Sequence, residues 1–242
     1  MNNLFLLAKR NLKEMLRDPL TMVFCLGFPL LMLIALPLIF SGMEVVPEIF
    51  KIENYAVGIC VFGYCFSALF VALTISGDKN SEFINRIKMS PIKKGIYPLS
   101  FVVALLPITI LQTLIFFILS LIVKMPFGAN LFIATAYLIP SAIFYISAGV
   151  LVGVICKTEK HAGPISSIII SLGCMLGGVF MPTENMGVFT TITNLLPFVH
   201  TVDIARGVFF GNYACIYPHI LWVIGYTAIL WIIIAIINKV RK

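Results

Sequence analysis

Charged side chains are scarce in this 242-residue sequence: Asp, Glu, Lys and Arg make up only 11% of it, whereas hydrophobic residues make up 60%. Soluble globular domains carry about 25% charged residues. The composition therefore excludes a soluble domain, and the mean hydropathy of +1.06 agrees. Because backbone groups in lipid must be satisfied internally, long apolar runs are expected to form helices. The predicted fold class is an all-α integral membrane protein.

Several catalytic and nucleotide-binding motifs are also missing. The sequence has no GxxxxGK[ST] phosphate-binding loop, no HExxH and no GxSxG. We therefore expect no enzymatic activity, and no ATP or Mg²⁺ bound by this chain. The six cysteines form no CxxC pair and most lie in apolar runs. Buried thiols are expected rather than a metal or redox centre.

Ionisable residues are nearly absent from six apolar runs, each long enough to cross a bilayer core of about 30 Å. These runs contain no Asp, Glu, Lys or Arg, and the last adds only His219. Ion-coupled carriers and cation channels usually keep an ionisable residue inside the membrane, so this absence disfavours both. The six predicted transmembrane helices are residues 20–40, 54–76, 99–123, 131–155, 163–181 and 217–238.

The basic residues that are present are distributed unevenly. With a cytoplasmic N-terminus, fourteen Lys and Arg residues fall on the inner side, and only Lys51, Lys124 and Arg206 fall on the outer side. The positive-inside rule therefore predicts that both termini are cytoplasmic. The net charge of +7 is then explained by basic residues of the inner side, which face anionic lipid headgroups. A nucleic-acid partner is not expected, because the basic residues form no single patch.

Residues 1–18 precede the first apolar run and have an amphipathic helical pattern. At helical spacing, one face collects Leu4, Ala8, Leu12 and Met15, and basic residues lie elsewhere. This pattern predicts an interfacial helix on the inner membrane surface. Asp18-Pro19 is expected to end the helix and turn the chain into the bilayer.

The longest inner loop, residues 78–98, contains a second amphipathic segment. Residues 82–89 can form about two helical turns, with Phe83, Ile84 and Ile87 on one side and Pro91 as the stop. Such a helix can lie on lipid or place its apolar side in a groove on a partner, and the residues alone leave both open. The candidate coupling residues are Glu82, Phe83, Ile84, Arg86, Ile87 and Pro91.

A third distinctive segment, residues 183–211, contains two short helical patterns parted by Pro197. Helices of about 10–13 residues cover only ~15–20 Å, which is too short to span the membrane. We predict a re-entrant helical hairpin on the outer face, between the fifth and sixth transmembrane helices. The candidate gate residues are Pro182, Glu184, Asn194, Pro197, His200, Asp203 and Arg206.

Three of these candidates, His200, Asp203 and Arg206, follow an i, i+3, i+6 spacing and share one side of the second half-helix. Asp203 and Arg206 can form an ion pair at this spacing. The group can line an outer gate, or it can be a salt bridge that satisfies charges at the outer interface. Glycines four apart, at 149 and 153 and at 173 and 177, are interpreted as helix-packing positions.

The residues GGVFMPTENMGVFTTITNLLPFVHTVDIARGVFFG (177–211) resemble the signature region of ABC-2-type permeases, the membrane subunits of bacterial ATP-binding-cassette exporters. Met186-Gly187 departs from the family pattern, which commonly has Met-Pro there. Leu195-Leu196 fill the two positions between Asn194 and Pro197. KRNLKEMLRDPLTM (9–22) resembles the family's interfacial entry helix, and DKNSEFINRIKMSPIKKG (78–95) resembles its ATPase-docking loop. The signature positions that match are Gly178, Phe180, Pro182, Glu184, Asn194, Pro197 and Arg206.

The resemblance implies a single ABC-2-type transmembrane domain over residues 1–242, in the bacterial cytoplasmic membrane. It further implies export of a drug-, lipid-, glycan- or peptide-like substrate. ATP and Mg²⁺ would be bound by two copies of a separate cytoplasmic ABC ATPase, and a second permease copy or paralogue would complete the assembly. The alternatives are a membrane scaffold or immunity-type protein that moves nothing, and an ion-coupled carrier.

Overall fold

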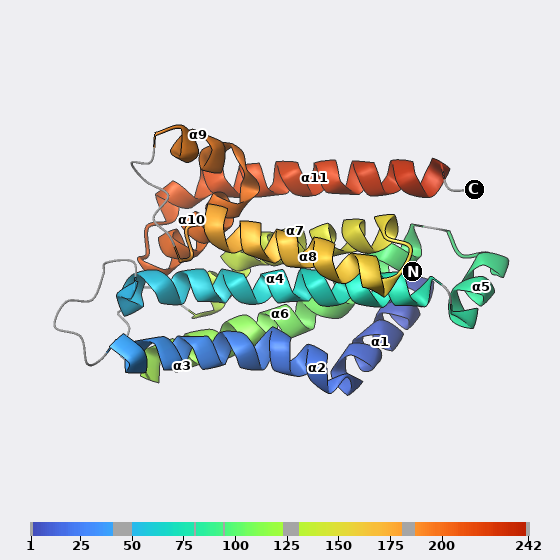
Figure 1. The fold of residues 1–242 in the computed structure, drawn as a ribbon, viewed down its shortest axis with the longest axis horizontal. Coiled ribbons are helices and arrows are strands. Elements are labelled where there is room, and N and C mark those ends of the chain that lie inside the picture. The colour runs from blue at the N-terminus through green and yellow to red at the C-terminus, as the bar shows by residue number, and fades with distance from the viewer. Residues whose placement is uncertain are drawn as a thin grey trace.

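The computed structural model describes residues 2–40, 50–79, 81–93, 95–122, 131–180 and 187–240, and these form an all-helical bundle without strands in the described ranges (Figure 1). The all-α prediction is therefore confirmed. The elements are α1 (Asn2–Arg17), α2 (Pro19–Met22), a π-helical turn η1 (Val23–Gly27), α3 (Phe28–Phe40), α4 (Ile52–Asp78), α5 (Glu82–Met89), α6 (Ile96–Ile122), α7 (Leu131–Ile155), α8 (Glu159–Leu176), α9 (Val188–Leu195), α10 (Pro197–Phe209), a 3₁₀ turn η3 (Tyr213–Cys215) and α11 (Ile216–Val240).

Among the described residues, five helices are long and apolar enough to cross a membrane. These spans are Pro19–Phe40, Asn54–Asp78, Ile96–Leu119, Phe132–Ile155 and Tyr213–Val240. The short helices α9 and α10 pass the same test only as a pair, and the pair is bent by 80°. The chain is thus a multi-pass membrane protein, and its described part contains five or, counting the bent pair, six candidate spans. The bend at Pro197 is the break that the sequence pattern indicates for residues 183–211.

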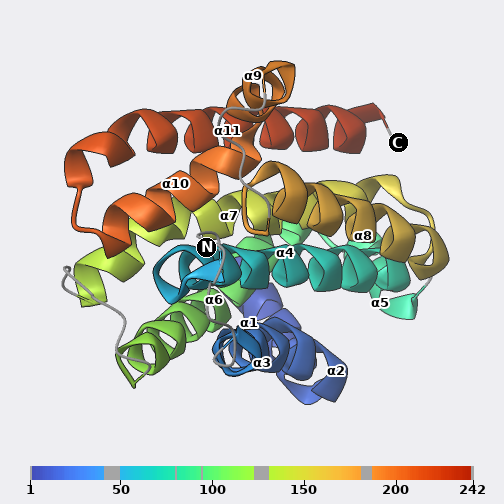
Figure 2. The same ribbon diagram turned by 60° about the vertical axis from the view of Figure 1, so that its left-hand side comes forward.

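The predicted helix at 163–181 is present as α8 but is shifted toward the N-terminus. It begins at Glu159 and ends at Leu176, so its first turn carries polar residues that lower its hydropathy. Eighteen residues cover about 27 Å, and α8 lies alongside α4 in the bundle (Figures 1 and 2). Its end is set by Gly178, which has a φ of 70°. The amide of Val179 donates to the carbonyl of Cys174 at 3.1 Å, a glycine-based helix stop.

The first span contains a local change in helix type that its prolines explain. The π-helical turn Val23–Gly27 ends just before Pro29. A proline lacks an amide donor and crowds the carbonyl four residues earlier, and a wider turn relieves that crowding. Asp18 ends α1 as predicted, and its carboxylate accepts from the amide of Leu20 at 3.2 Å and from the hydroxyl of Thr21 at 2.6 Å.

The central helix is α4, which packs against α3, α6, α7, α8 and α10. Its closest neighbour is α7. A Cβ built on Gly149 would lie 2.2 Å from the carbonyl oxygen of Ala68, and one on Gly153 would lie 3.2 Å from the Cα of Ala72. Glycines on α7 thus face alanines on α4, each pair four residues apart, which confirms the packing interpretation for this pair.

Large apolar side chains remain exposed on both outer edges of the bundle, along α3 and α11. This is expected for a chain whose surface meets lipid or a neighbouring subunit rather than water. The most exposed include Leu31, Leu38, Ile39, Leu221, Ile232 and Val240. All six cysteines lie in the described ranges as free thiols, and five of them are buried. The expectation of buried thiols fails only for Cys215, which lies in the exposed turn before α11.

Candidate functional site

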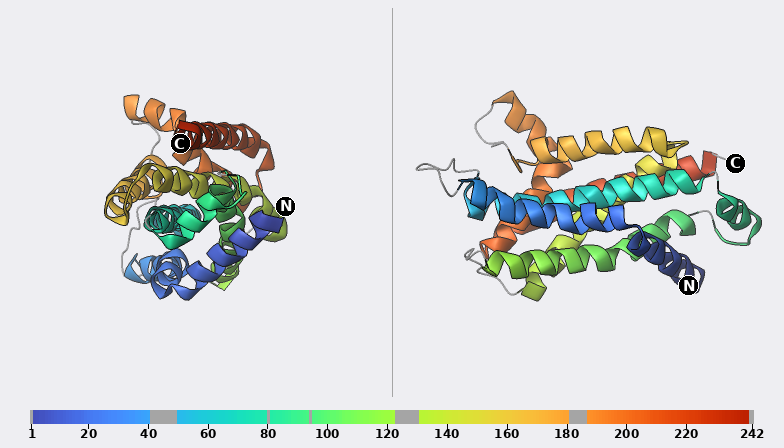
Figure 3. Two further views of the ribbon diagram at one scale, coloured as in Figure 1. Left: turned by 90° about the vertical axis from the view of Figure 1, so that its right-hand side faces the viewer. Right: turned by 60° about the horizontal axis from the view of Figure 1, so that its bottom comes forward.

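The described chain has polar clusters at its two opposite ends. The start of α1, the end of α11 and α5 lie at one end of the bundle, and the bent pair α9–α10 lies at the other (Figures 1 and 3). We call them the terminal-end cluster and the hairpin-end cluster. The first collects residues of α1, α4, α5 and α6, and the second collects residues of α9, α10 and α11.

The terminal-end cluster centres on Asp78, the last residue of α4, whose side chain is only 11% exposed. Arg10 of α1 forms an ion pair with it at 2.8 Å, and the hydroxyl of Tyr97 on α6 donates to it at 2.7 Å. Arg10 also pairs with Glu14 at 3.0 Å. A nearby hydrogen bond of 2.8 Å joins Asn11 of α1 to Ser100 of α6. These contacts fix α1 across the ends of α4 and α6.

The short helix α5 is present over residues 82–89, as the sequence indicates. Ser81 caps it by accepting from the amide of Ile84 at 3.4 Å. Ser90 is extended, as expected before Pro91, and this ends the helix. Phe83 lies under the guanidinium of Arg10, 3.9 Å from ring centroid to carbon, and beside the ring of Tyr97 at 6.4 Å.

The structure therefore turns part of the apolar side of α5 toward its own chain. Ile84 is buried and Ile87 is half-buried, whereas Glu82 is exposed. The side chain of Arg86 is 77% exposed and residue Met89 is 80% exposed. A partner meeting α5 from outside the bundle would contact Glu82, Arg86 and Met89 first. The pattern of Phe83, Ile84 and Ile87 alone did not distinguish an inward face from a partner-facing one.

Lys79 continues the same junction on the opposite side of α4. Its ammonium donates to the carbonyl of Val154 at 2.6 Å and also to the carbonyl of Cys156, at the C-terminal end of α7. A cation at this position satisfies the last carbonyls of a helix and complements its dipole. Two consecutive residues, Asp78 and Lys79, thus bind α1 and α7 to the end of α4.

A cavity of about 330 Å³ opens beside this junction, and its lining includes four carboxylates, those of Glu14, Asp18, Asp78 and Glu159. Burial raises the pKa of Glu14 above its usual range, against the opposing effect of Arg10 and with a further rise from Asp78. Arg10 and the Tyr97 hydroxyl satisfy Asp78, and Asp18 caps α2. With the Arg10–Glu14 ion pair, three of the four acids therefore already have partners in the described chain.

At the other end, the hairpin-end cluster depends on a tight return of the chain from α10 to α11. Pro197 occupies the first position of α10, where its missing amide costs nothing. Gly211, with a φ of 70°, follows the end of α10 and reverses the chain. A Cβ on Gly207 would lie 2.7 Å from Cγ1 of Ile216, so α10 and α11 are in close contact there.

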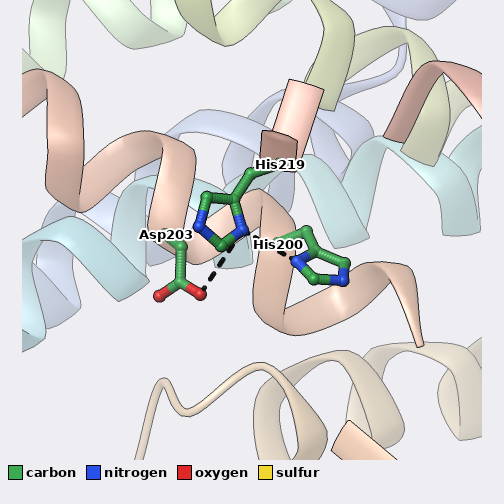
Figure 4. Close-up of side chains that lie close together, drawn as sticks. All are labelled: His200, Asp203 and His219. Carbon is green, nitrogen blue, oxygen red and sulfur yellow. Dashed lines mark hydrogen bonds and ion pairs between the residues drawn. The ribbon is translucent and has the colours of Figure 1, made fainter. Parts of the chain in front are cut away.

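This return brings His219 of α11 against the predicted polar side of α10 (Figure 4). Nδ1 of His219 lies 2.8 Å from Nδ1 of His200 and 3.8 Å from Oδ2 of Asp203. Nε2 of His200 lies 2.9 Å from the backbone oxygen of Asn194. Ligand atoms of the two imidazoles and the carboxylate all lie within 4.8 Å of one another, an arrangement that can hold a metal ion.

Arg206 ties this cluster to the end of α8. Its guanidinium pairs with Oδ1 of Asp203 at 3.3 Å and donates to the carbonyl of Gly178 at 3.2 Å. The i, i+3 pair expected from the sequence is therefore present. Both side chains of the pair are a little over a quarter exposed, so the pair is neither deeply buried nor freely solvated.

Aromatic side chains of α11 hold the other side of the cluster. The ring of Trp222 stacks on His200 at 5.4 Å between centroids, with an angle of 12° between the planes. The hydroxyl of Tyr226 donates to the carbonyl of Leu195 at 2.7 Å. The last helix thus contacts α9 and α10 together.

The predicted gate residues are only partly brought together. His200, Asp203 and Arg206 share one side of α10, whereas Asn194 contributes through its backbone carbonyl and Pro197 by starting the helix. Pro182 and Glu184 lie outside the described residues. His219 completes the group, although the sequence pattern marked it only as a polar residue in an apolar run.

The described chain is a helical bundle with long apolar spans, a bent helix pair at one end and a short amphipathic helix at the other, which is the architecture of a multi-pass membrane domain. The chain belongs to the ABC-2 type transporter family, whose model matches residues 2–210. No curated protein and no solved structure matches the chain. It is accordingly a permease of an ABC transporter, and the family implies an ABC ATPase as a partner. The helix α11 lies beyond the matched residues.

Proposed function

We propose that this chain exports its substrate from the cytoplasm, driven by two copies of a cytoplasmic ABC ATPase that dock at the end of the bundle carrying α5. The substrate is drug-, lipid-, glycan- or peptide-like. A second copy of the permease or a paralogue completes the assembly in the bacterial cytoplasmic membrane. In this orientation both termini are cytoplasmic, α1 lies in the inner interface, and the hairpin α9–α10 faces outward.

The observation that carries the proposal is the exposed side of α5. Met89 is 80% exposed, and the side chains of Arg86 and Glu82 are 77% and 89% exposed. An exposed apolar residue beside charged ones on a short helix suits docking in a groove on a protein partner. The inner side of the same helix is held by Arg10 through its contact with Phe83. A force applied to the exposed side therefore reaches the bundle.

The same contacts suggest how nucleotide-driven motion is transmitted. Closure of the ATPase pair displaces α5, and the contacts of Phe83 with Arg10 and Tyr97 carry the displacement to α1 and α6. Asp78 carries it to α4, which runs through the centre of the bundle to the hairpin end. There the outer hairpins of two permease copies separate and release the cargo.

The docking surface is tested by purifying the tagged chain from membranes of its own host and measuring vanadate-sensitive MgATP hydrolysis in the eluate. The variant Met89→Asp is expected to lose at least about tenfold of the co-purified activity, since a buried unpaired charge costs several kcal/mol. Val188→Asp is the matched control, because Val188 is 77% exposed at the opposite end of the bundle.

Equal ATPase recovery with the wild type, Met89→Asp and Val188→Asp would refute docking through α5. ATP-dependent export by the reconstituted complex separates an exporter from a scaffold or immunity-type protein, which would move nothing. Flux that collapses with an ion gradient while ATP is intact would instead identify an ion-coupled carrier.

A further inference from the structure

We propose that His200, Asp203 and His219 form a binding site for a divalent transition-metal ion such as Zn²⁺, which joins α10 to α11 at the hairpin end. The site needs neither the ATPase nor the cargo, so it is independent of the proposed transport function. Two imidazoles and one carboxylate are ligands that zinc uses in sites with three protein ligands and a water. Imidazole also suits copper, nickel and cobalt.

The spacing of the three ligand atoms is close to that of such a site. Metal–ligand distances of about 2.0–2.2 Å place the ligand atoms of a tetrahedral site roughly 3.3–3.5 Å apart. The two histidine nitrogens are 2.8 Å apart, and the nearest nitrogen–carboxylate distance is 3.8 Å. The first distance must open and the second must close, each by about half an ångström by the same geometry. The third pair, His200 and Asp203, lies within 4.8 Å and must close by up to about 1.5 Å. Side-chain rotation alone provides movements of this size.

The neighbours of the ligands already orient them for a metal ion. A carbonyl can only accept, so Nε2 of His200 carries the proton that is donated to Asn194. In the neutral ring, Nδ1 of His200 then has its lone pair directed toward His219. A histidine that binds a metal through one ring nitrogen typically donates a hydrogen bond from the N–H of the other to a carbonyl or a carboxylate. Trp222 stacks on the same ring and fixes its plane.

The carboxylate is oriented in a similar manner. Arg206 binds Oδ1 of Asp203, which leaves Oδ2 directed toward His219 (Figure 4). His200 is buried, whereas the side chains of Asp203 and His219 are 28% and 26% exposed. The site is thus closed on the protein side and accessible on the other, where water can complete the coordination.

An ion at this position would connect two segments that are otherwise joined by a short turn. His200 and Asp203 belong to the second half of the hairpin, and His219 belongs to the last helix. Binding is therefore expected to hold the hairpin against α11 and to raise the unfolding temperature of the whole chain.

The test uses the full-length chain in detergent, purified without an oligohistidine tag, with Zn²⁺ binding measured against a chromophoric zinc indicator. We expect one zinc ion per chain, and affinity reduced at least about tenfold in His200→Ala and in His219→Ala. His161→Ala removes the third histidine of the sequence, an exposed residue at the opposite end of the bundle, and should bind as the wild type does. Cys215→Ser should also bind normally, which excludes the nearby exposed thiol as the ligand.

A second measurement on the wild type needs no variant to fold. Co²⁺ added to the metal-free chain should give the intense visible absorption of a tetrahedral site, and equimolar Zn²⁺ should abolish it. The proposal is overturned if the wild type binds no zinc at millimolar concentration. It is also overturned if the absorption and the affinity are the same in His219→Ala as in the wild type.

Discussion

Substituting Gly149 by alanine tests the contact on which the centre of the bundle depends. The new Cβ would lie 2.2 Å from the carbonyl oxygen of Ala68 and 2.7 Å from its Cα. Both are backbone atoms, so a side-chain rotation cannot relieve the overlap. Ordinary contacts between heavy atoms lie near 3.5 Å, and α4 and α7 must therefore separate locally by about 1 Å.

The expected destabilisation follows from that separation. A radial gap of roughly 0.5–1 Å forfeits about a quarter to a half of each dispersion contact along the interface, and overpacking typically costs about 1–3 kcal/mol. Alanine regains up to about 1 kcal/mol through its higher helix propensity. With the full propensity gain the net loss should be about 0–2 kcal/mol, which lowers the Tm of a chain of this length by up to about 8 °C.

Thermal unfolding of the purified chain in detergent measures this difference. Gly225→Ala on α11 is the matched control, because no neighbouring side chain or helix of the described chain lies within 4 Å of the new Cβ. It carries the same gain in helix propensity without the overlap, and its Tm should equal or exceed that of the wild type. If Gly149→Ala and Gly225→Ala unfold at the same temperature, the close approach of α4 and α7 does not limit stability.

Two further experiments probe polar groups of the bundle. A double-mutant cycle of Arg10→Ala and Asp78→Ala, followed by denaturant unfolding, should give a coupling energy of about 1–2 kcal/mol. The reason is that the Asp78 side chain is only 11% exposed. A coupling energy near zero would mean that the two residues behave as a solvated surface pair. Gln112→Leu should raise the unfolding free energy by about 1–3 kcal/mol, since both amide atoms of Gln112 are buried without a hydrogen-bond partner in the described chain. A loss of stability in Gln112→Leu would show that the amide is paired in the membrane-embedded protein.

The features visible in the sequence are those that depend on local composition. Each predicted span corresponds to a helix whose ends lie within a few residues of the expected positions, except at α8. The break before Pro197 and the packing glycines on α7 follow from rules that involve neighbouring residues only. The early end of α8 was missed because an apolar run continues past Gly178, although its φ of 70° terminates the helix there.

The remaining features depend on how distant segments meet. The contact between His200 and His219 requires the reversal at Gly211 and the close crossing at Gly207, and a linear pattern contains neither. The orientation of α5 is a similar case. Its apolar side was visible in the sequence, but the presence of Arg10 above Phe83 was not.

The end of α4 has a mechanical consequence. Asp78 holds α1 and Lys79 holds the last carbonyls of α7, while Ser81 begins α5 just downstream. These residues, which are close together in the sequence, connect α1, α5 and α7 to the same end of α4. If the proposed ATPase docks on α5, a displacement of that helix is therefore expected to move α1, α4 and α7 together.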